Sequence, residues 1–265
     1  MKYRFLVFLI FFIILQSGKL SSRLNDLFEK EINAGDYRIF ITYDEDNYFT
    51  GSIQVADKYN NTVFYADSFY TKYYKDTLTD LDQNGTKELV LDLGTGALMY
   101  DYNMLLIFDF GKKDIDPLEV HNAELVYSED GIPEILSTVR LSPSVLGAGY
   151  SFDLKYKNGN LNLVSGNDSK AEVGKAPEDE DIWYPIDEYK KDNDECEEGS
   201  QFIVYFEAYL MQQKLQGDEE KGWAFFDKNY TCSDKETKRK DLKKLTDQTY
   251  SELKDPDSYR FGYRY

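Results

Sequence analysis

Residues 80–91 read Asp-Leu-Asp-Gln-Asn-Gly-Thr-Lys-Glu-Leu-Val-Leu, and they form the most informative stretch of the chain. Oxygen-bearing side chains stand at positions one, three, five and nine, and a glycine stands at position six. Calcium requires six to eight oxygen ligands, and alternate side chains of a tight loop converge on one point where the backbone turns sharply. The apolar residues 89–91 are typical of a β-strand. The stretch therefore predicts an ion-binding loop that leads directly into a strand.

The candidate ligands are oxygens at alternate positions of this loop. They are the side chains of Asp80, Asp82, Asn84 and Glu88 and the backbone carbonyl of Thr86. An EF-hand has a glutamate at position twelve and continues into a helix, whereas the twelfth residue here is Leu91 in an expected strand. The loop is therefore not an EF-hand. An Asx-rich turn that binds no ion is the alternative interpretation of the same residues.

The loop resembles the calcium loops of FG-GAP and VCBS repeats, which occur in integrin-like β-propellers. Their pattern is Asp-x-Asp-x-Asp/Asn-Gly-x-x-Asp/Glu followed by a hydrophobic strand, and the glycine-rich residues 92–96 extend the likeness. The resemblance implies calcium as the bound ion. Residues 128–136 form a degenerate second copy that lacks the leading aspartates, so we expect it to bind no ion. Two copies are too few for a complete seven-bladed propeller.

The chain around the loop is a succession of short segments rich in Val, Ile, Tyr, Phe and Thr, separated by Asn, Asp and Gly. Apolar residues alternate with polar ones at Ile39, Ile41 and Tyr43, which favours half-buried antiparallel strands. A sandwich, a barrel or a propeller-like meander fits this pattern. We expect strands at residues 37–43, 48–56, 62–69, 88–93, 104–110, 118–127, 134–141, 150–156 and 161–164, with hairpin turns at 57–61 and 157–160.

The N-terminus has the layout of a secretory signal. Lys2 and Arg4 precede an unbroken apolar run at residues 5–15, and a polar stretch follows. The run is shorter than the roughly 20 residues that a membrane-spanning helix needs. We therefore expect export, with an uncleaved anchor as the alternative. Residues 22–32, with four apolar residues on one helical face, are expected to form a short helix.

The last third of the chain changes character twice. Acidic residues crowd residues 169–200, which predicts an extended linker, or alternatively a docking strip anchored by Trp183 and Tyr184. Helical periodicity follows, and it predicts helices at 201–215, at 218–229 and from Asp234 to about Leu253. The expected fold is α+β. We divide it into a signal peptide at 1–22, a β-rich calcium-loop domain at 23–168, the linker at 169–200 and a helical domain at 201–265.

Cys196 and Cys232 are the only thiols of the chain. In an oxidising compartment they form the obvious disulfide. Neither belongs to a CxxC motif or lies beside a histidine, so the sequence supports no redox or zinc role. Two unpaired buried cysteines are the alternative.

The chain is strongly acidic, with 49 Asp and Glu against 31 Lys and Arg and a formal net charge of −18. Binding to nucleic acid requires a positive surface that neutralises phosphates, so we exclude it. The single histidine, His121, leaves little room for catalytic histidine dyads, for multi-histidine zinc sites or for the usual serine and cysteine triads. An acidic exported protein is instead attracted to basic partners.

We therefore expect a secreted or periplasmic, calcium-binding and calcium-stabilised protein-interaction module that has no enzymatic activity and no membrane span after signal removal. Its partner would be a basic protein or a glycan. An inhibitor of a basic enzyme such as lysozyme is one variant, because small secreted β proteins with a single loop of this kind resemble bacterial periplasmic lysozyme inhibitors. An exported hydrolase that uses two carboxylates is the alternative from another class. An envelope protein of purely structural role is the third.

Overall fold

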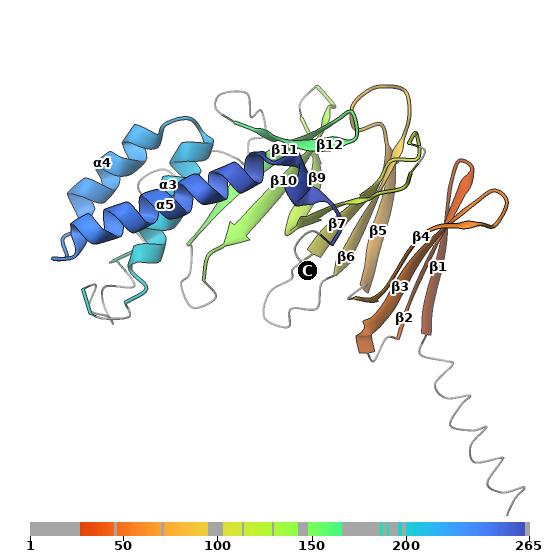
Figure 1. Cartoon of the computed structure of the whole chain (residues 1–265), viewed down its shortest axis with the longest axis horizontal. Coiled ribbons are helices and arrows are strands. Elements are labelled where there is room, and N and C mark those ends of the chain that lie inside the picture. The colour runs from red at the N-terminus through yellow and green to blue at the C-terminus, as the bar shows by residue number, and fades with distance from the viewer. Residues whose placement is uncertain are drawn as a thin grey trace, which may run out of the picture. The chain divides into compact units, whose positions relative to one another are not determined.

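The computed structural model describes residues 27–44, 47–69, 72–94, 103–112, 114–128, 130–142, 148–165, 186–187, 190, 196–197 and 200–262. Within them the fold is α+β, with three antiparallel four-stranded sheets followed by three helices (Figure 1). The predicted fold class is confirmed. The predicted signal peptide, the last two residues of the glycine-rich stretch (95–96) and most of the acidic linker lie outside the described residues.

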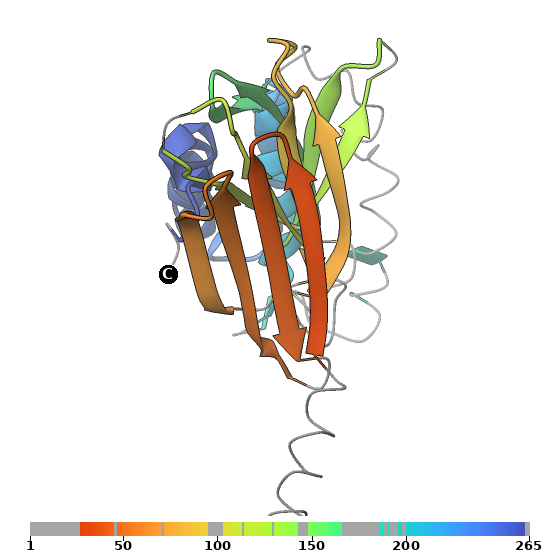
Figure 2. The same cartoon turned by 90° about the vertical axis from the view of Figure 1, so that its right-hand side faces the viewer.

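The first sheet has the order β1-β2-β3-β4 and is seen face-on in Figure 2. Its strands are β1 (Leu27–Ala34), β2 (Tyr37–Asp44), β3 (Asn47–Asp57) and β4 (Thr62–Phe69). The alternation noted in the sequence buries Ile39, Ile41 and Tyr43 on one face of β2, as predicted for a half-buried antiparallel strand.

The helix predicted at residues 22–32 is wrong for its described part, because β1 occupies residues from Leu27 onward. β1 pairs with β2 along its whole length, from Leu27 opposite Asp44 to Ala34 opposite Tyr37. Ile32 and Ala34 are buried, which is the period of two of a strand. The apolar spacing of this segment fits either element, and the cross-strand partners that β2 supplies decide in favour of the strand.

The second and third sheets contain the remaining eight strands. The second has the order β5-β6-β7-β8, with β5 (Lys72–Thr79), β6 (Glu88–Gly94), β7 (Asn103–Phe108) and β8 (Leu118–His121). The third has the order β12-β11-β10-β9, with β9 (Ala123–Tyr127), β10 (Pro133–Arg140), β11 (Gly149–Lys157) and β12 (Asn160–Val164). The sequence did not predict β5, which is mostly polar. The strand predicted at 118–127 is two strands, separated at Asn122 by a left-handed backbone (φ 48°).

The three predicted helices are confirmed, and they lie beside one another in Figure 1. They are α3 (Ile203–Leu215), α4 (Glu219–Asn229) and α5 (Lys235–Lys254), and a short 3-10 helix, η3 (Pro256–Tyr259), follows. Gln212 joins α3 to β11, because its side-chain oxygen accepts from the Ser151 N–H at 2.8 Å and its amide donates to the Ser151 carbonyl at 3.3 Å. Helix α3 is therefore joined to the third sheet by a pair of hydrogen bonds as well as by apolar contacts.

The described residues fall into two compact units. Unit 1 comprises those of residues 1–76, 91–103 and 112–115, and unit 2 comprises those of residues 77–90, 104–111 and 116–265. This division differs from the expected boundary at the acidic linker, because unit 2 contains all three helices together with the third sheet. One apolar core of unit 2 joins Phe152 and Leu154 of β11 to Met211 of α3.

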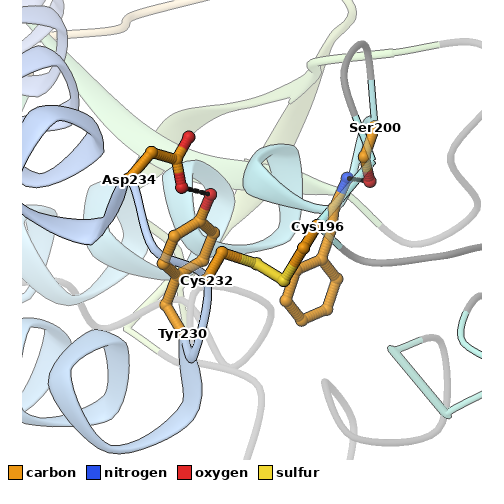
Figure 3. The surroundings of a disulfide bond; sticks show 6 residues. Cys196, Ser200, Tyr230, Cys232 and Asp234 are labelled. Carbon is orange, nitrogen blue, oxygen red and sulfur yellow. Dashed lines mark hydrogen bonds between the residues drawn. A yellow bond between two sulfur atoms is a disulfide. The ribbon is translucent and has the colours of Figure 1, made fainter.

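Cys196 and Cys232 form the predicted disulfide, shown in Figure 3. Cys232 belongs to an aromatic-rich buried cluster of unit 2 and immediately precedes the first turn of α5. Asp234 is the N-cap residue of α5, but its carboxylate accepts the Tyr230 hydroxyl at 3.0 Å and makes no capping bond to the helix. The disulfide is consistent with a location outside the cytoplasm. Among the described residues, no helix combines the length and the apolar character needed to cross a membrane.

Candidate metal centre

The loop between β5 and β6 is anchored in the core of unit 2 by its second residue. Leu81 is buried in the apolar core, and its backbone N–H donates to Glu88 Oε2 at 2.7 Å. Glu88 is the first residue of β6, and its side chain is wholly buried. The apolar anchor and this hydrogen bond together hold the Glu88 carboxylate beneath the loop.

The exposed part of the loop is closed by its own side chains. Both oxygens of Asp80 accept backbone N–H groups, from Asn84 at 2.9 Å and from Gly85 at 2.8 Å. Asn84 Oδ1 in turn accepts the Thr86 N–H at 2.7 Å. The backbone is left-handed at Gln83 (φ 59°) and at Gly85 (φ 90°), which explains why a glycine stands at position six. The turn is therefore as sharp as an ion-binding loop requires.

Three carboxylates converge below this turn. One oxygen each of Asp80, Asp82 and Glu88 lie within 4.8 Å of one another. Two further facts distinguish this group from an ordinary acidic surface: Asp82 Oδ1 and Glu88 Oε1 are both shielded from solvent, and neither has a hydrogen-bond partner. Buried anionic oxygens without partners are costly, and a bound cation satisfies them. The donor set therefore fits a hard divalent ion.

The electrostatics of Glu88 reflect this crowding. The pKa of the Glu88 carboxyl is raised to about 7, chiefly by burial and in addition by the negative charges of Asp82 and Asp109, whereas the hydrogen bond from the Leu81 N–H opposes the shift. A carboxylate that resists ionisation while its neighbours are negative is stabilised in its charged form by a cation.

A second chain segment, which no local motif indicates, completes the surroundings of the centre. The Asn158 N–H donates to Asp82 Oδ2 at 3.1 Å, and the Tyr156 hydroxyl donates to Asp109 Oδ2 at 2.7 Å. Burial and the acceptor Asp109 both raise the pKa of Tyr156 above its usual value, so the hydroxyl keeps its proton. These contacts join residues 47 and 76 positions apart, which explains why a local motif did not indicate them.

Only three of the five predicted ligands have side chains that converge on one point. The carboxylates of Asp80, Asp82 and Glu88 are brought together, whereas Asn84 and Thr86 lie in the exposed turn and are joined to each other by a hydrogen bond. Among the described residues these three form the only metal-capable group of His, Cys, Asp and Glu side chains. The described residues of the degenerate copy lie between β9 and β10 and at the start of β10, and Ser128 Oγ accepts the Ile132 N–H at 3.1 Å.

The arrangement can hold a cation, but it offers little to a large substrate, because Glu88 has no exposed surface. Comparisons with protein-family models, with curated proteins and with solved structures gave no match.

Proposed function

We propose that residues 80–88 bind one calcium ion and that the protein is a secreted or periplasmic, calcium-stabilised protein-interaction module. The observation that carries the proposal is the pair of buried oxygens without partners, Asp82 Oδ1 and Glu88 Oε1. Asp80 adds a third carboxylate, and Asn84 and the Thr86 carbonyl supply the remaining protein oxygens of the proposed ligand set. The ion would replace a repulsion between buried carboxylates by a set of metal–oxygen bonds.

The donor set supports calcium over other ions. All proposed ligands are hard oxygens, and no histidine or cysteine belongs to the group, which disfavours zinc and copper. Magnesium demands near-ideal octahedral geometry and keeps several waters, whereas calcium accepts the irregular oxygen cage of a loop. The likeness to FG-GAP and VCBS loops points to the same ion. Extracellular calcium modules typically have dissociation constants of about 10⁻⁴–10⁻³ M, which makes the ion a structural one outside a cell.

Thermal unfolding with calcium and with a chelator tests this proposal. With a dissociation constant in that range, 10 mM calcium should stabilise unit 2 by about 1.4–2.7 kcal/mol, which raises the melting temperature by about 3–10 °C. The double variant Asp80→Ala, Asp82→Ala should lose this rise. A melting curve of the unaltered protein that is the same in calcium and in chelator contradicts the proposal.

A matched control separates an ion site from a hydrogen-bonded turn. Asp57 closes the β3–β4 turn in the way that Asp80 closes the loop, because it accepts the N–H groups of Tyr59 and Asn61, both at 2.8 Å. No second carboxylate joins it in a metal-capable group among the described residues. Asp57→Ala should lower the melting temperature while the rise with calcium stays intact.

The interaction role is supported by exposed apolar side chains in unit 1. Tyr59, Val63 and Tyr65 are 75%, 39% and 57% exposed and lie on the β3–β4 hairpin, and β4 is an edge strand. Exposed tyrosines on a rigid scaffold are effective contact residues, because they bury a large area at a small entropic cost. The hydrogen bonds of Asp57 close the β3–β4 turn, and Lys58 of the same turn pairs with Asp36 at 2.8 Å.

The net charge of −18 favours a basic protein as the partner of this hairpin. Lysozyme, a basic enzyme, is a defined probe. The hairpin proposal predicts salt-sensitive binding that the double variant Tyr59→Ser, Tyr65→Ser weakens at least tenfold, measured by surface plasmon resonance. If the unaltered protein does not bind lysozyme, or if the double variant binds it equally well, lysozyme is not the target of this hairpin. A pull-down from the protein's own extracellular medium, with both proteins in parallel, then decides whether any basic partner depends on the two tyrosines.

A carboxylate hydrolase is the weaker interpretation of the same centre. Glycoside hydrolysis uses two carboxyl groups that flank the scissile bond, and one of them has a raised pKa. Asp82 and Glu88 resemble such a pair in proximity, and the pKa of Glu88 is raised to about 7. Glu88 is wholly buried, however, so a glycosidic bond has no access to it in this structure.

A further inference from the structure

We propose that Asp109, which follows β7, is a fourth carboxylate of the metal centre, and that it strengthens ion binding through its charge without bonding to the ion. This inference rests on the proposed calcium site. The loop motif does not contain Asp109. The charge of Asp109 would determine how strongly the centre discriminates between ions of different charge.

Asp109 is held in one orientation by two donors. Oδ2 accepts the Tyr156 hydroxyl at 2.7 Å and Oδ1 accepts the Gly111 N–H at 2.9 Å. Because both oxygens already accept a hydrogen bond, Asp109 needs no metal bond to satisfy them. Asp82 and Glu88 differ in this respect, since each has a buried oxygen without a partner. Both oxygens of Asp80 also accept hydrogen bonds, but Asp80 belongs to the group of three carboxylates whose oxygens lie within 4.8 Å of one another, and Asp109 does not. Asp109 is therefore a fixed carboxylate outside the ligand set.

The turn that contains Asp109 packs against the ion-binding loop. A Cβ atom at Gly111 would lie 3.2 Å from Asp109 Oδ1 and 3.4 Å from Thr86 Cγ2, so this turn and the seventh loop position are in contact through a glycine. The end of β11 gives the same proximity, because Tyr156 donates to Asp109 and Asn158, two residues further on, donates to Asp82 Oδ2 at 3.1 Å.

A fixed charge outside the ligand set has a recognisable effect on binding. The Coulomb energy between Asp109 and the ion is proportional to the charge of the ion and is reduced by salt. The loss of binding free energy on removing this charge is therefore 3/2 times as large for a trivalent lanthanide as for calcium. If Asp109→Asn weakens calcium binding about tenfold at low salt, it should weaken lanthanide binding about thirtyfold. A structural disturbance of the loop has no reason to follow this ratio.

Terbium luminescence of the full chain provides the measurement. Tyr156 lies beside the centre and can sensitise bound terbium, so a terbium titration gives the trivalent affinity, and displacement by calcium gives the divalent one. Both affinities are measured for the unaltered protein, for Asp109→Asn and for Asp109→Ser as a second neutral variant. Each titration is made at low and at high salt.

The expected result is a larger loss for terbium than for calcium, in the ratio given above, and a marked reduction of both losses at high salt. Equal losses for the two ions, losses independent of salt, or no loss in either neutral variant would overturn the role of Asp109 while the calcium site itself stands. If the unaltered protein binds neither ion, the calcium proposal fails first and the role of Asp109 fails with it.

Discussion

At the scale of single residues, Glu88 is the side chain on which the centre depends. It is the only one of the three converging carboxylates that is wholly buried, and one of its oxygens has no partner. Burial and the charges of Asp82 and Asp109 raise its pKa to about 7, so the calcium-free protein carries an unfavourable buried charge at that position. The same charge becomes favourable once a cation is bound.

Replacing this charge should therefore have opposite consequences with and without the ion. Glu88→Gln keeps the acceptor for the Leu81 N–H and removes the negative charge. In chelator we expect the variant to be as stable as the unaltered protein or more stable, because a repulsion is lost. In 10 mM calcium we expect it to be less stable by about 1.4–2.7 kcal/mol, because the gain from ion binding disappears. Urea unfolding in both media measures this. A variant destabilised equally in both media contradicts the account.

The loop residues could be predicted from sequence because their chemistry is local. Asp80, Asp82 and Glu88 are spaced around a glycine within nine residues, and the structure brings their carboxylates together. Asp109 and Tyr156 could not be predicted in this way, because their contact joins the residue after β7 to β11 across 47 residues. A single sequence does not show which strands become neighbours.

At the scale of elements, α3 and α5 are joined by an ionic contact. Lys214 of α3 pairs with Glu219 at the start of α4 and with Asp247 of α5, and it lies over the Tyr250 ring. Hydrogen bonds from Lys214 and Lys243 lower the pKa of Asp247. Lys214 is more deeply buried than Asp247, so the carboxylate of Asp247 helps to balance a positive charge that has little contact with water.

The pH dependence of this contact has a definite sign. Because the pKa of Asp247 is lowered in the folded state from its ordinary value of 3.8, the contact stabilises the fold above that value and is lost as the pH falls through the lower, folded-state pKa. Asp247→Asn should therefore destabilise the protein at pH 7 by less than about 1 kcal/mol, since Asp247 is half exposed. The difference should vanish in strong acid. Chemical unfolding at pH 7 and below pH 3 checks this, and a difference that persists in acid contradicts it.

The disulfide constrains the segment that contains α3 and α4. Cys196 and Cys232 are 36 residues apart, so on the chain-entropy model the bond stabilises the fold by about 3–4 kcal/mol. The double variant Cys196→Ser, Cys232→Ser should lose about this much in chemical unfolding under oxidising conditions. Loss of less than about 1 kcal/mol would show that the segment is ordered without the bond.

Most of the strands and all three helices could be predicted from the sequence, but two segments could not. Strands with clear alternation, such as β2 and β11, and the three helices with a helical period were predicted almost to their ends. The helix expected over 22–32 is a strand from Leu27, and the polar strand β5 was missed. Both failures concern segments whose conformation depends on pairing with a neighbour, which outweighs local preference.

At the scale of the whole molecule, the centre and the exposed hairpin belong to different compact units. The loop of residues 80–88, the turn at 109–111 and the β11–β12 hairpin belong to unit 2, whereas β1 to β4 belong to unit 1. Calcium should therefore stabilise the segments that contact the centre and leave the first sheet unchanged. Hydrogen exchange should show increased protection at residues 80–90, 105–111 and 153–161 with calcium. Protection that rises equally in residues 30–57 contradicts a local site.

Isothermal calorimetry of the full chain against calcium measures whether one ion binds to the carboxylates of the loop. Glu88→Gln is the comparison and Asp57→Ala is the control. We expect one site per chain with a dissociation constant of about 10⁻⁴–10⁻³ M, abolished by Glu88→Gln and retained by Asp57→Ala. No saturable binding up to 10 mM calcium, or binding that Glu88→Gln leaves unchanged, would contradict this expectation.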